Sequence, residues 1–106
     1  AGILHMSHGL ATYLGQFNIR VVAVAPGPTR TAIWTREGGL MDFYAGKYDL
    51  PREEAVTTEL RHRGMAIPRL AEPEEVAALM LYLASPQAAS ITRATVDIHG
   101  GSHHSY

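Results

Sequence analysis

The chain has 106 residues, which is enough for one small domain, and 46% of them are hydrophobic, as in an ordinary globular protein. The formal net charge of -1 gives no basic surplus, so the composition argues against nucleic acid as a partner. There is no cysteine, which excludes disulfides and thiolate chemistry.

Apolar stretches along the chain are short. None approaches the roughly 18 residues that a membrane helix needs, and the N-terminus lacks the charged region and apolar core of a signal peptide. We therefore expect a cytoplasmic protein with no membrane partner. The chain begins with Ala1 and runs straight into an amphipathic pattern, so we also expect it to be part of something longer.

Residues 1–17 carry apolar side chains at steps of three and four, which predicts an amphipathic helix that ends at Asn18. The apolar stripe of this helix consists of Ile3, Met6, Leu10, Leu14 and Phe17, with Tyr13 beside them. The opposite side carries His5, His8, Thr12 and Gln16.

Residues 19–25 form an almost continuously apolar, valine-rich run, which is typical of a strand covered on both faces in a parallel sheet. The strand must stop at Pro26, because proline cannot donate a hydrogen bond to a neighbouring strand. A Pro-Gly turn then leaves two hydroxyl residues, Thr29 and Thr31, at the end of the strand. Ligands of open α/β sheets bind at such carboxyl ends, so we expect a ligand site here.

Residues 32–65 contain no second buried strand. The segment is rich in glycine and aromatic residues, and Asp49 followed by Pro51 predicts the start of a helix that runs to about Arg63. A long helical excursion between two core elements is typical of a lid or a substrate loop.

The last third of the chain predicts one helix and one strand. Pro73 and the acids after it predict a helix start, because acids in the first turn meet the positive end of the helix dipole. The helix ends before Pro86, and its buried stripe consists of Val76, Met80, Leu83 and Ala84. A short strand follows at residues 94–99.

The order of elements therefore predicts an α/β protein with two parallel strands joined by a crossover that contains helices. Two strands are too few for an independent sheet, because both edges would stay open. We expect the chain to be one part of a larger α/β sheet or to complete itself by association.

Several motifs, in this order along the chain, resemble the C-terminal half of a short-chain dehydrogenase/reductase, and residues 1–14 resemble the helix that follows the family's active-site lysine. The motifs are NIRVVAVAPG at 18–27, PGPTRT at 26–31, RLAEPEEVA at 69–77, LYLAS at 81–85, SITR at 90–93 and DIHGG at 97–101. The family patterns that they match are gIRVNaVaPG, Pro-Gly-x-x-x-Thr, R-x-g-x-PeEvA, FLaS and yiTG…vDGG.

The resemblance implies that residues 1–106 are the C-terminal portion of one NAD(P)-binding domain, a Rossmann-like doubly wound parallel sheet that is incomplete on its own. Family members bind NAD or NADP and move a hydride to or from a carbonyl or alcohol carbon. Pro26 and Gly27 would shape the loop beside the nicotinamide. The backbone N–H near Thr29 and the hydroxyl of Thr31 would hold the carboxamide, since a hydroxyl both donates and accepts.

The resemblance also implies that residues 32–65 are the substrate loop for a small carbonyl or alcohol. The pocket lining expected from it consists of Trp34, Met41, Phe43 and Tyr44. The partners expected are the missing N-terminal half and further copies of the chain in a dimer or tetramer.

Important parts of the family pattern lie upstream of Ala1: the Gly-rich phosphate loop, the catalytic Ser and the Tyr-x-x-x-Lys pair. The pair Tyr44 and Lys47 is one residue too short to replace the last of these. Without the Tyr there is no proton donor for the carbonyl, so no catalytic residue is assigned here. The alternative is a catalytically inactive truncated fragment that acts only through association.

Two residues depart from the family pattern, and several allow a plainer interpretation. Arg93 stands where the family usually has Gly, before the last strand, and His99 where it usually has Asp, near the subunit edge. Thr31 could be only a helix N-cap, and Trp34 could be plain core. Among the six histidines, His5 and His8 share a helix face and His103 and His104 lie in the tail, but no carboxylate lies at ligand spacing within either group. We therefore interpret the histidines as solvated or packed side chains and predict no metal site.

Overall fold

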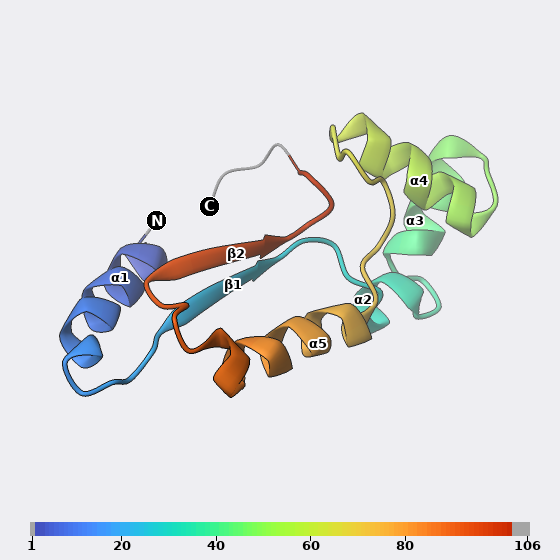
Figure 1. The fold of residues 1–106 in the computed structure, drawn as a ribbon. Coiled ribbons are helices and arrows are strands. Elements are labelled where there is room, and N and C mark those ends of the chain that lie inside the picture. The colour runs from blue at the N-terminus through green and yellow to red at the C-terminus, as the bar shows by residue number, and fades with distance from the viewer. Residues whose placement is uncertain (1, 103–106) are drawn as a thin grey trace.

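The computed structural model describes residues 2–102, and its elements follow one another as helix, strand, helical excursion, helix and strand (Figure 1). The helices and strands are α1 (Gly2–Gly15), β1 (Val22–Pro26), α2 (Ala32–Thr35), α3 (Leu40–Tyr48), α4 (Arg52–His62), α5 (Pro73–Ala84), the 3-10 helix η1 (Pro86–Ala88) and β2 (Ala94–Ile98). We call residues 32–65, with α2 to α4, the cap, and the remaining described residues the framework.

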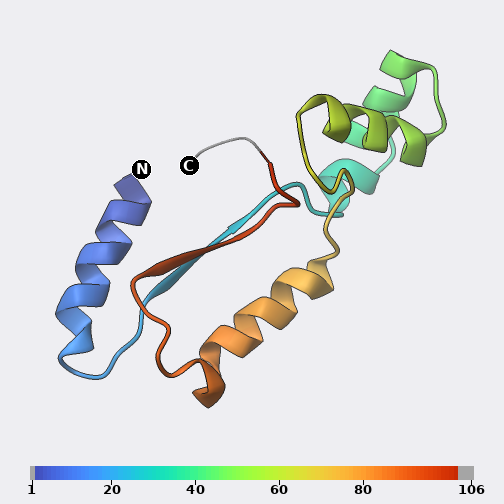
Figure 2. The same ribbon diagram turned by 45° about the horizontal axis from the view of Figure 1, so that its top comes forward.

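The two strands pair in parallel, with Val22 opposite Ala94 and Pro26 opposite Ile98. Helices α1 and α5 lie on opposite sides of the pair, and the cap lies beyond the carboxyl ends of both strands (Figures 1 and 2). The α/β arrangement with a parallel, incomplete sheet is therefore the one predicted. Pro26 ends β1 as expected.

The buried face of α1 differs from the stripe predicted for it. Ala11 is the buried residue of this helix, whereas Ile3 is 74% exposed and Phe17 is also exposed. His8, predicted on the polar side, is half-buried. Leu14 of the predicted stripe is half-buried, but Ile3, Met6 and Leu10 are exposed, so most of that stripe does not face the rest of the framework. Periodicity correctly predicted a helix but did not identify the face that packs.

The start of α5 was predicted correctly, and its buried stripe only in part, because Val76 is half-buried but two of the four predicted positions are exposed. The Glu75 carboxylate accepts a hydrogen bond from the backbone N–H of Glu72 at 2.8 Å, which satisfies a donor that the helix leaves free. Leu83 is buried as predicted, whereas Met80 and Ala84 are exposed. The two strands cover only one stripe of the helix, which leaves these two positions open.

The hydrophobic core sits in the cap, where α3 packs on α4. Its members are Trp34, Met41, Val56, Leu60, Met65 and, from the connector to α5, Leu70. No helix among residues 2–102 is long and apolar enough to cross a membrane.

Candidate functional site

The loop of residues 27–31 leaves β1 and is held on two sides. On one side, the Gly27 N–H donates to the Ile98 carbonyl of β2 at 3.0 Å, and a Cβ on Gly27 would lie 2.6 Å from that of His99, so only glycine fits. On the other, the Arg30 N–H donates to the Ala71 carbonyl at 2.8 Å. The loop therefore has a fixed position at the carboxyl end of the sheet.

The two threonines of this loop offer polar groups to a ligand. The Thr29 hydroxyl donates to the Gly27 carbonyl at 2.9 Å, and the Thr31 hydroxyl donates to the Thr29 carbonyl at 3.3 Å. The backbone N–H groups of Thr29 and Thr31 donate to no other group among residues 2–102. Two amide donors beside a hydroxyl suit a planar carboxamide, which both donates and accepts.

The interpretation of Thr31 as only a cap is not favoured by its geometry. Thr31 is the N-cap residue of α2, but its side chain makes no capping hydrogen bond. Because its hydroxyl is exposed and points back along the loop to Thr29, it remains accessible to a bound molecule.

Arg30, between the two threonines, makes the strongest polar contacts of the loop. Its Nε donates to Oε1 of Glu72 at 2.9 Å, and its Nη1 donates to Oε1 of Glu53 at 2.7 Å. These hydrogen bonds, first that to Glu53 and then that to Glu72, raise the pKa of the guanidinium above its ordinary value. The sequence pattern did not single out Arg30, because its partners are 23 and 42 residues away.

The four residues predicted to line a substrate pocket lie in or on the cap. Trp34 and Met41 are buried in its core, Tyr44 is half-buried and stacks on Trp34 at 6.0 Å between ring centroids, and Phe43 is 62% exposed. The structure thus brings Trp34, Met41 and Tyr44 together in the interior. This favours the core interpretation of Trp34, and a pocket-lining role for the group stays a prediction.

The interior of the cap also holds a buried carboxylate that the sequence analysis missed. Glu59 accepts hydrogen bonds from the Tyr48 hydroxyl and from Arg63 Nε, both at 2.7 Å. Burial by itself would raise the pKa of Glu59, but the hydrogen bonds from Arg63 and Tyr48 outweigh it and hold the pKa below its ordinary value. The i,i+4 spacing of Glu59 and Arg63 was the available signal.

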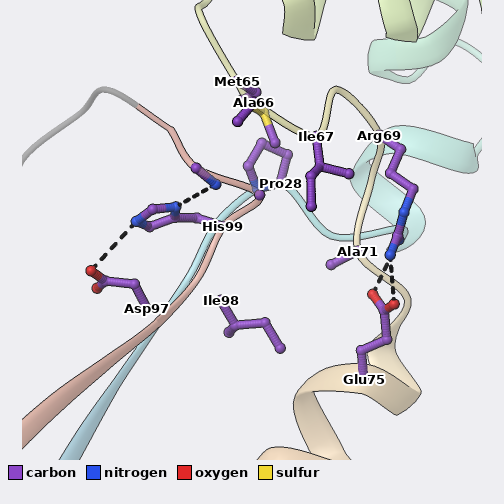
Figure 3. A pocket seen from close by; sticks show the side chains of 12 residues that line it. Pro28, Met65, Ala66, Ile67, Arg69, Ala71, Glu75, Asp97, Ile98 and His99 are labelled. Atoms are coloured by element: carbon purple, nitrogen blue, oxygen red, sulfur yellow. Dashed lines mark hydrogen bonds and ion pairs between the residues drawn. The ribbon is translucent and has the colours of Figure 1, made fainter.

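A cavity of about 460 Å³ lies behind the loop, between β2 and the connector from the cap to α5 (Figure 3). Figure 3 shows Ile98 between two polar pairs, the ion pair of Arg69 with Glu75 on one side and His99 with Asp97 on the other. The cavity is therefore lined by apolar side chains such as Ile67 and Ile98, with the charged groups of Arg69, Glu75 and Asp97 at its margin.

The two departures from the family pattern both keep the local fold. His99 Nδ1 accepts the backbone N–H groups of Gly101 and Ser102 at 3.1 and 3.0 Å, as a carboxylate oxygen can. Arg93 takes a left-handed conformation with φ of 55°, and its N–H donates to the Val21 carbonyl at 2.9 Å. The turn before β2 therefore forms with Arg in a conformation that favours glycine.

Groups with metal-ligand character are dispersed in the part of the chain that the structure describes. No three His, Asp or Glu side chains among residues 2–102 lie close enough to hold a metal ion. His103 and His104, which the sequence analysis weighed, lie outside the described residues.

Comparison with known proteins finds relatives over almost the whole chain. A family model described as enoyl-(acyl carrier protein) reductase matches residues 1–103. The A-factor type gamma-butyrolactone 1'-reductase (1S-forming) of Streptomyces virginiae is 34% identical over 99 residues, which cover 93% of this chain and 34% of that protein. The chain thus spans about a third of this relative's length.

Two solved structures are similar in fold. The NADPH-bound short-chain oxidoreductase of Pseudomonas aeruginosa PAO1 aligns with a TM-score of 0.76 and 26% identity, over 98% of this chain and 37% of that one. The 3-oxoacyl-[acyl-carrier protein] reductase of Brucella melitensis with bound NAD aligns with a TM-score of 0.68 and 30% identity, over 98% and 31%. Both alignments include cap and framework together.

Proposed function

Because the chain belongs to the short-chain dehydrogenase/reductase family, we propose that it forms the nicotinamide-side wall and the substrate cap of an NAD(P)-dependent oxidoreductase. NAD(P) is the cofactor of this family, and the α/β fold described above is a part of the family's Rossmann-like sheet. The reaction proposed for the whole protein is hydride transfer between nicotinamide and the carbonyl or alcohol carbon of a small molecule.

The observation that carries this proposal is the loop after β1. Its position at the carboxyl end of a parallel strand is where open α/β sheets bind ligands. The free N–H groups of Thr29 and Thr31 and the Thr31 hydroxyl fit the carboxamide of nicotinamide. Bound there, NAD(P) would supply the hydride, and these residues would fix which face of the ring the substrate meets.

The order of the motifs supports a place in the C-terminal part of the family fold. Within that proposal, the Gly-rich phosphate loop and the Ser, Tyr and Lys of the active site belong to a segment before Ala1. The chain's own residues then bind and orient, while proton transfer to the carbonyl belongs to the other segment. Hydride transfer by these 106 residues alone is expected to be undetectable.

The apolar side chains that α1 leaves exposed support the proposed partners, which are the N-terminal half and further copies in a dimer or tetramer. They include Ile3, Met6 and Leu10. The same observation supports the second candidate, an inactive protein that acts only through association, because such a surface needs a partner whether or not the whole is an enzyme. We place the proposed enzyme in the cytoplasm, which the cysteine-free sequence permits.

Titration of the whole protein, with the proposed segment before Ala1 present, separates the two candidates; NADH and NADPH are added and the backbone amide signals are followed by NMR. We expect the amides of Thr29 and Thr31 to shift first. Thr31→Val should weaken binding about ten-fold through the lost hydrogen bond, while Thr31→Ser should bind as the parent does. A whole protein that associates in sedimentation but shows no shift with either dinucleotide would support the association candidate instead.

A further inference from the structure

Leu70 of the framework packs into the core of the cap, but the helices of the two regions make few contacts with one another. Helices α2, α3 and α4 make their main contacts with one another, and α1 and α5 make theirs with β1 or η1. Of the ion pairs among residues 2–102, the pair of Arg30 and Glu53 joins the cap to the framework, whereas the others lie within one region. This pair is therefore a specific link between the two.

The geometry of the link is a fork. Two nitrogens of the Arg30 guanidinium face the two carboxylate oxygens of Glu53, with Nη1 to Oε1 at 2.7 Å and Nη2 to Oε2 at 3.4 Å. The third nitrogen, Nε, faces Glu72 at the start of α5. One planar cation thus connects the first turn of α4 with the first turn of α5, which a lysine ammonium could not do with the same geometry.

The backbone of Arg30 connects this link to the nicotinamide loop. Its N–H bonds the Ala71 carbonyl at 2.8 Å, and the Ala71 N–H bonds the Pro28 carbonyl at 3.0 Å. Thr29 and Thr31 are the residues directly before and after Arg30 in the chain. Any displacement of the guanidinium therefore acts on the segment that carries the free N–H groups.

The ion pair of Arg30 and Glu53 is accessible to water, and water weakens the attraction between the two charges. The Arg30 side chain is 32% exposed and that of Glu53 is 66% exposed. Ion pairs of this kind contribute little to stability and weaken with salt, so they can break while both regions stay folded. A weak polar link beside the apolar contact of Leu70 is suited to adjust the relative position of the two regions.

We propose that Arg30 is a positioning residue whose fork to Glu53 holds the cap over the loop of Thr29 and Thr31. The role of that loop in nicotinamide binding rests on the proposed function, but the coupling between the cap and the loop does not. In the whole enzyme, release of Glu53 would let α4 move away from the nicotinamide side and would loosen the loop at the same time.

Amide hydrogen exchange of the full chain, measured by NMR, tests the coupling directly. The reporters are the amides of Arg30 and Ala71, and the references are the amides of Leu60 within α4 and Val24 within β1. Glu53→Gln should speed exchange of both reporters about two- to five-fold, the range that an exposed pair allows, and leave both references unchanged. Addition of about 0.5 M NaCl should speed exchange of both reporters in the parent by a similar factor and should cause no further increase in Glu53→Gln.

Glu54→Gln is the matched control, because it removes the same charge from the same turn of α4 outside the fork. It should leave all four amides unchanged. Arg30→Lys, which keeps the charge without the fork, should resemble Glu53→Gln. Reporters that do not respond to Glu53→Gln, or references that speed up equally, would overturn the proposal, since the second result means a general loss of stability.

A parallel titration with NADH and NADPH keeps the two proposals distinguishable. If neither dinucleotide shifts Thr29 or Thr31, the proposed function fails for this chain, while the exchange result still decides the coupling. If they bind and Glu53→Gln leaves the reporters at parental rates, the coupling fails alone.

Discussion

The cap and the framework bury their side chains to different extents. The cap contains most of the buried hydrophobic residues, among them Trp34, Val56 and Leu60, and a buried ion pair with a tyrosine partner. In the framework, Ala11, Leu83 and Ala88 are buried and Leu70 is buried against the core of the cap, while large side chains such as Ile3 and Leu81 are exposed. A short segment can thus complete a core locally, whereas two strands and two helices cannot.

The difference shows where each region obtains its stability. A helical hairpin closes on itself over about 30 residues, so its apolar faces meet without distant help. A parallel sheet needs neighbours at both edges and helices on both faces. The framework, which the proposed function makes part of a larger sheet, presents those faces to a partner.

Truncation of one leucine in each region, buried in the cap and exposed in the framework, gives the largest contrast. Leu60 is 0% exposed in the cap, so Leu60→Ala should lower the free energy of unfolding by about 2–5 kcal/mol. Leu81 is 73% exposed on α5, so Leu81→Ala should change it by less than about 0.5 kcal/mol. Urea unfolding followed by the fluorescence of Trp34, the single tryptophan, measures both. Equal losses would contradict the contrast.

Acid should weaken the cap through Glu59. The pKa of this carboxyl is lowered in the folded chain from its ordinary value of 4.5, so the folded state binds fewer protons than the unfolded state. Its stabilisation is therefore fully present above about pH 4.5 and is lost as the pH falls through the lower folded pKa. Glu59→Gln should remove this pH dependence and lower stability at neutral pH by about 1–3 kcal/mol.

The measurement is urea unfolding of the parent and of Glu59→Gln from pH 7 to pH 3. Glu54→Gln is a suitable control, because it removes a carboxyl from the exposed side of α4. A parent whose stability does not fall more steeply in acid than that of Glu59→Gln would show that the buried network does not stabilise the cap.

Local signals in the sequence predicted the elements well, and distant partners explain what they missed. Pro26 ends a strand and Pro73 starts a helix through the geometry of their own backbone, so no other part of the chain is needed to predict them. The face of α1 depends on what covers it, and the fork of Arg30 depends on carboxylates far along the chain. The free N–H of Thr29 is likewise a property of the folded loop.

The chain after β2 is fixed by hydrogen bonds to His99, whereas the cap is fixed by apolar packing. Substitutions of His99 test this difference. His99→Leu removes the acceptor of two backbone N–H groups and should cost about 1–2 kcal/mol of unfolding free energy. His99→Asp, which restores an oxygen acceptor, should recover most of it. Both are measured by urea unfolding at pH 7, and a loss with Asp as large as with Leu would show that the imidazole itself is required.

The smallest effect is expected in the turn before β2, where the framework keeps a strained residue. Arg93 is left-handed, with φ of 55°, which is unfavourable for a side chain with a Cβ and neutral for glycine. Arg93→Gly relieves this but also gives the unfolded chain more freedom, so the net gain should be at most about 1 kcal/mol. Arg93→Ala keeps the Cβ and loses the charge, so it should give no gain in the same urea unfolding measurement. A gain with Ala equal to that with Gly would assign the effect to the charge and leave the left-handed backbone without a measurable penalty.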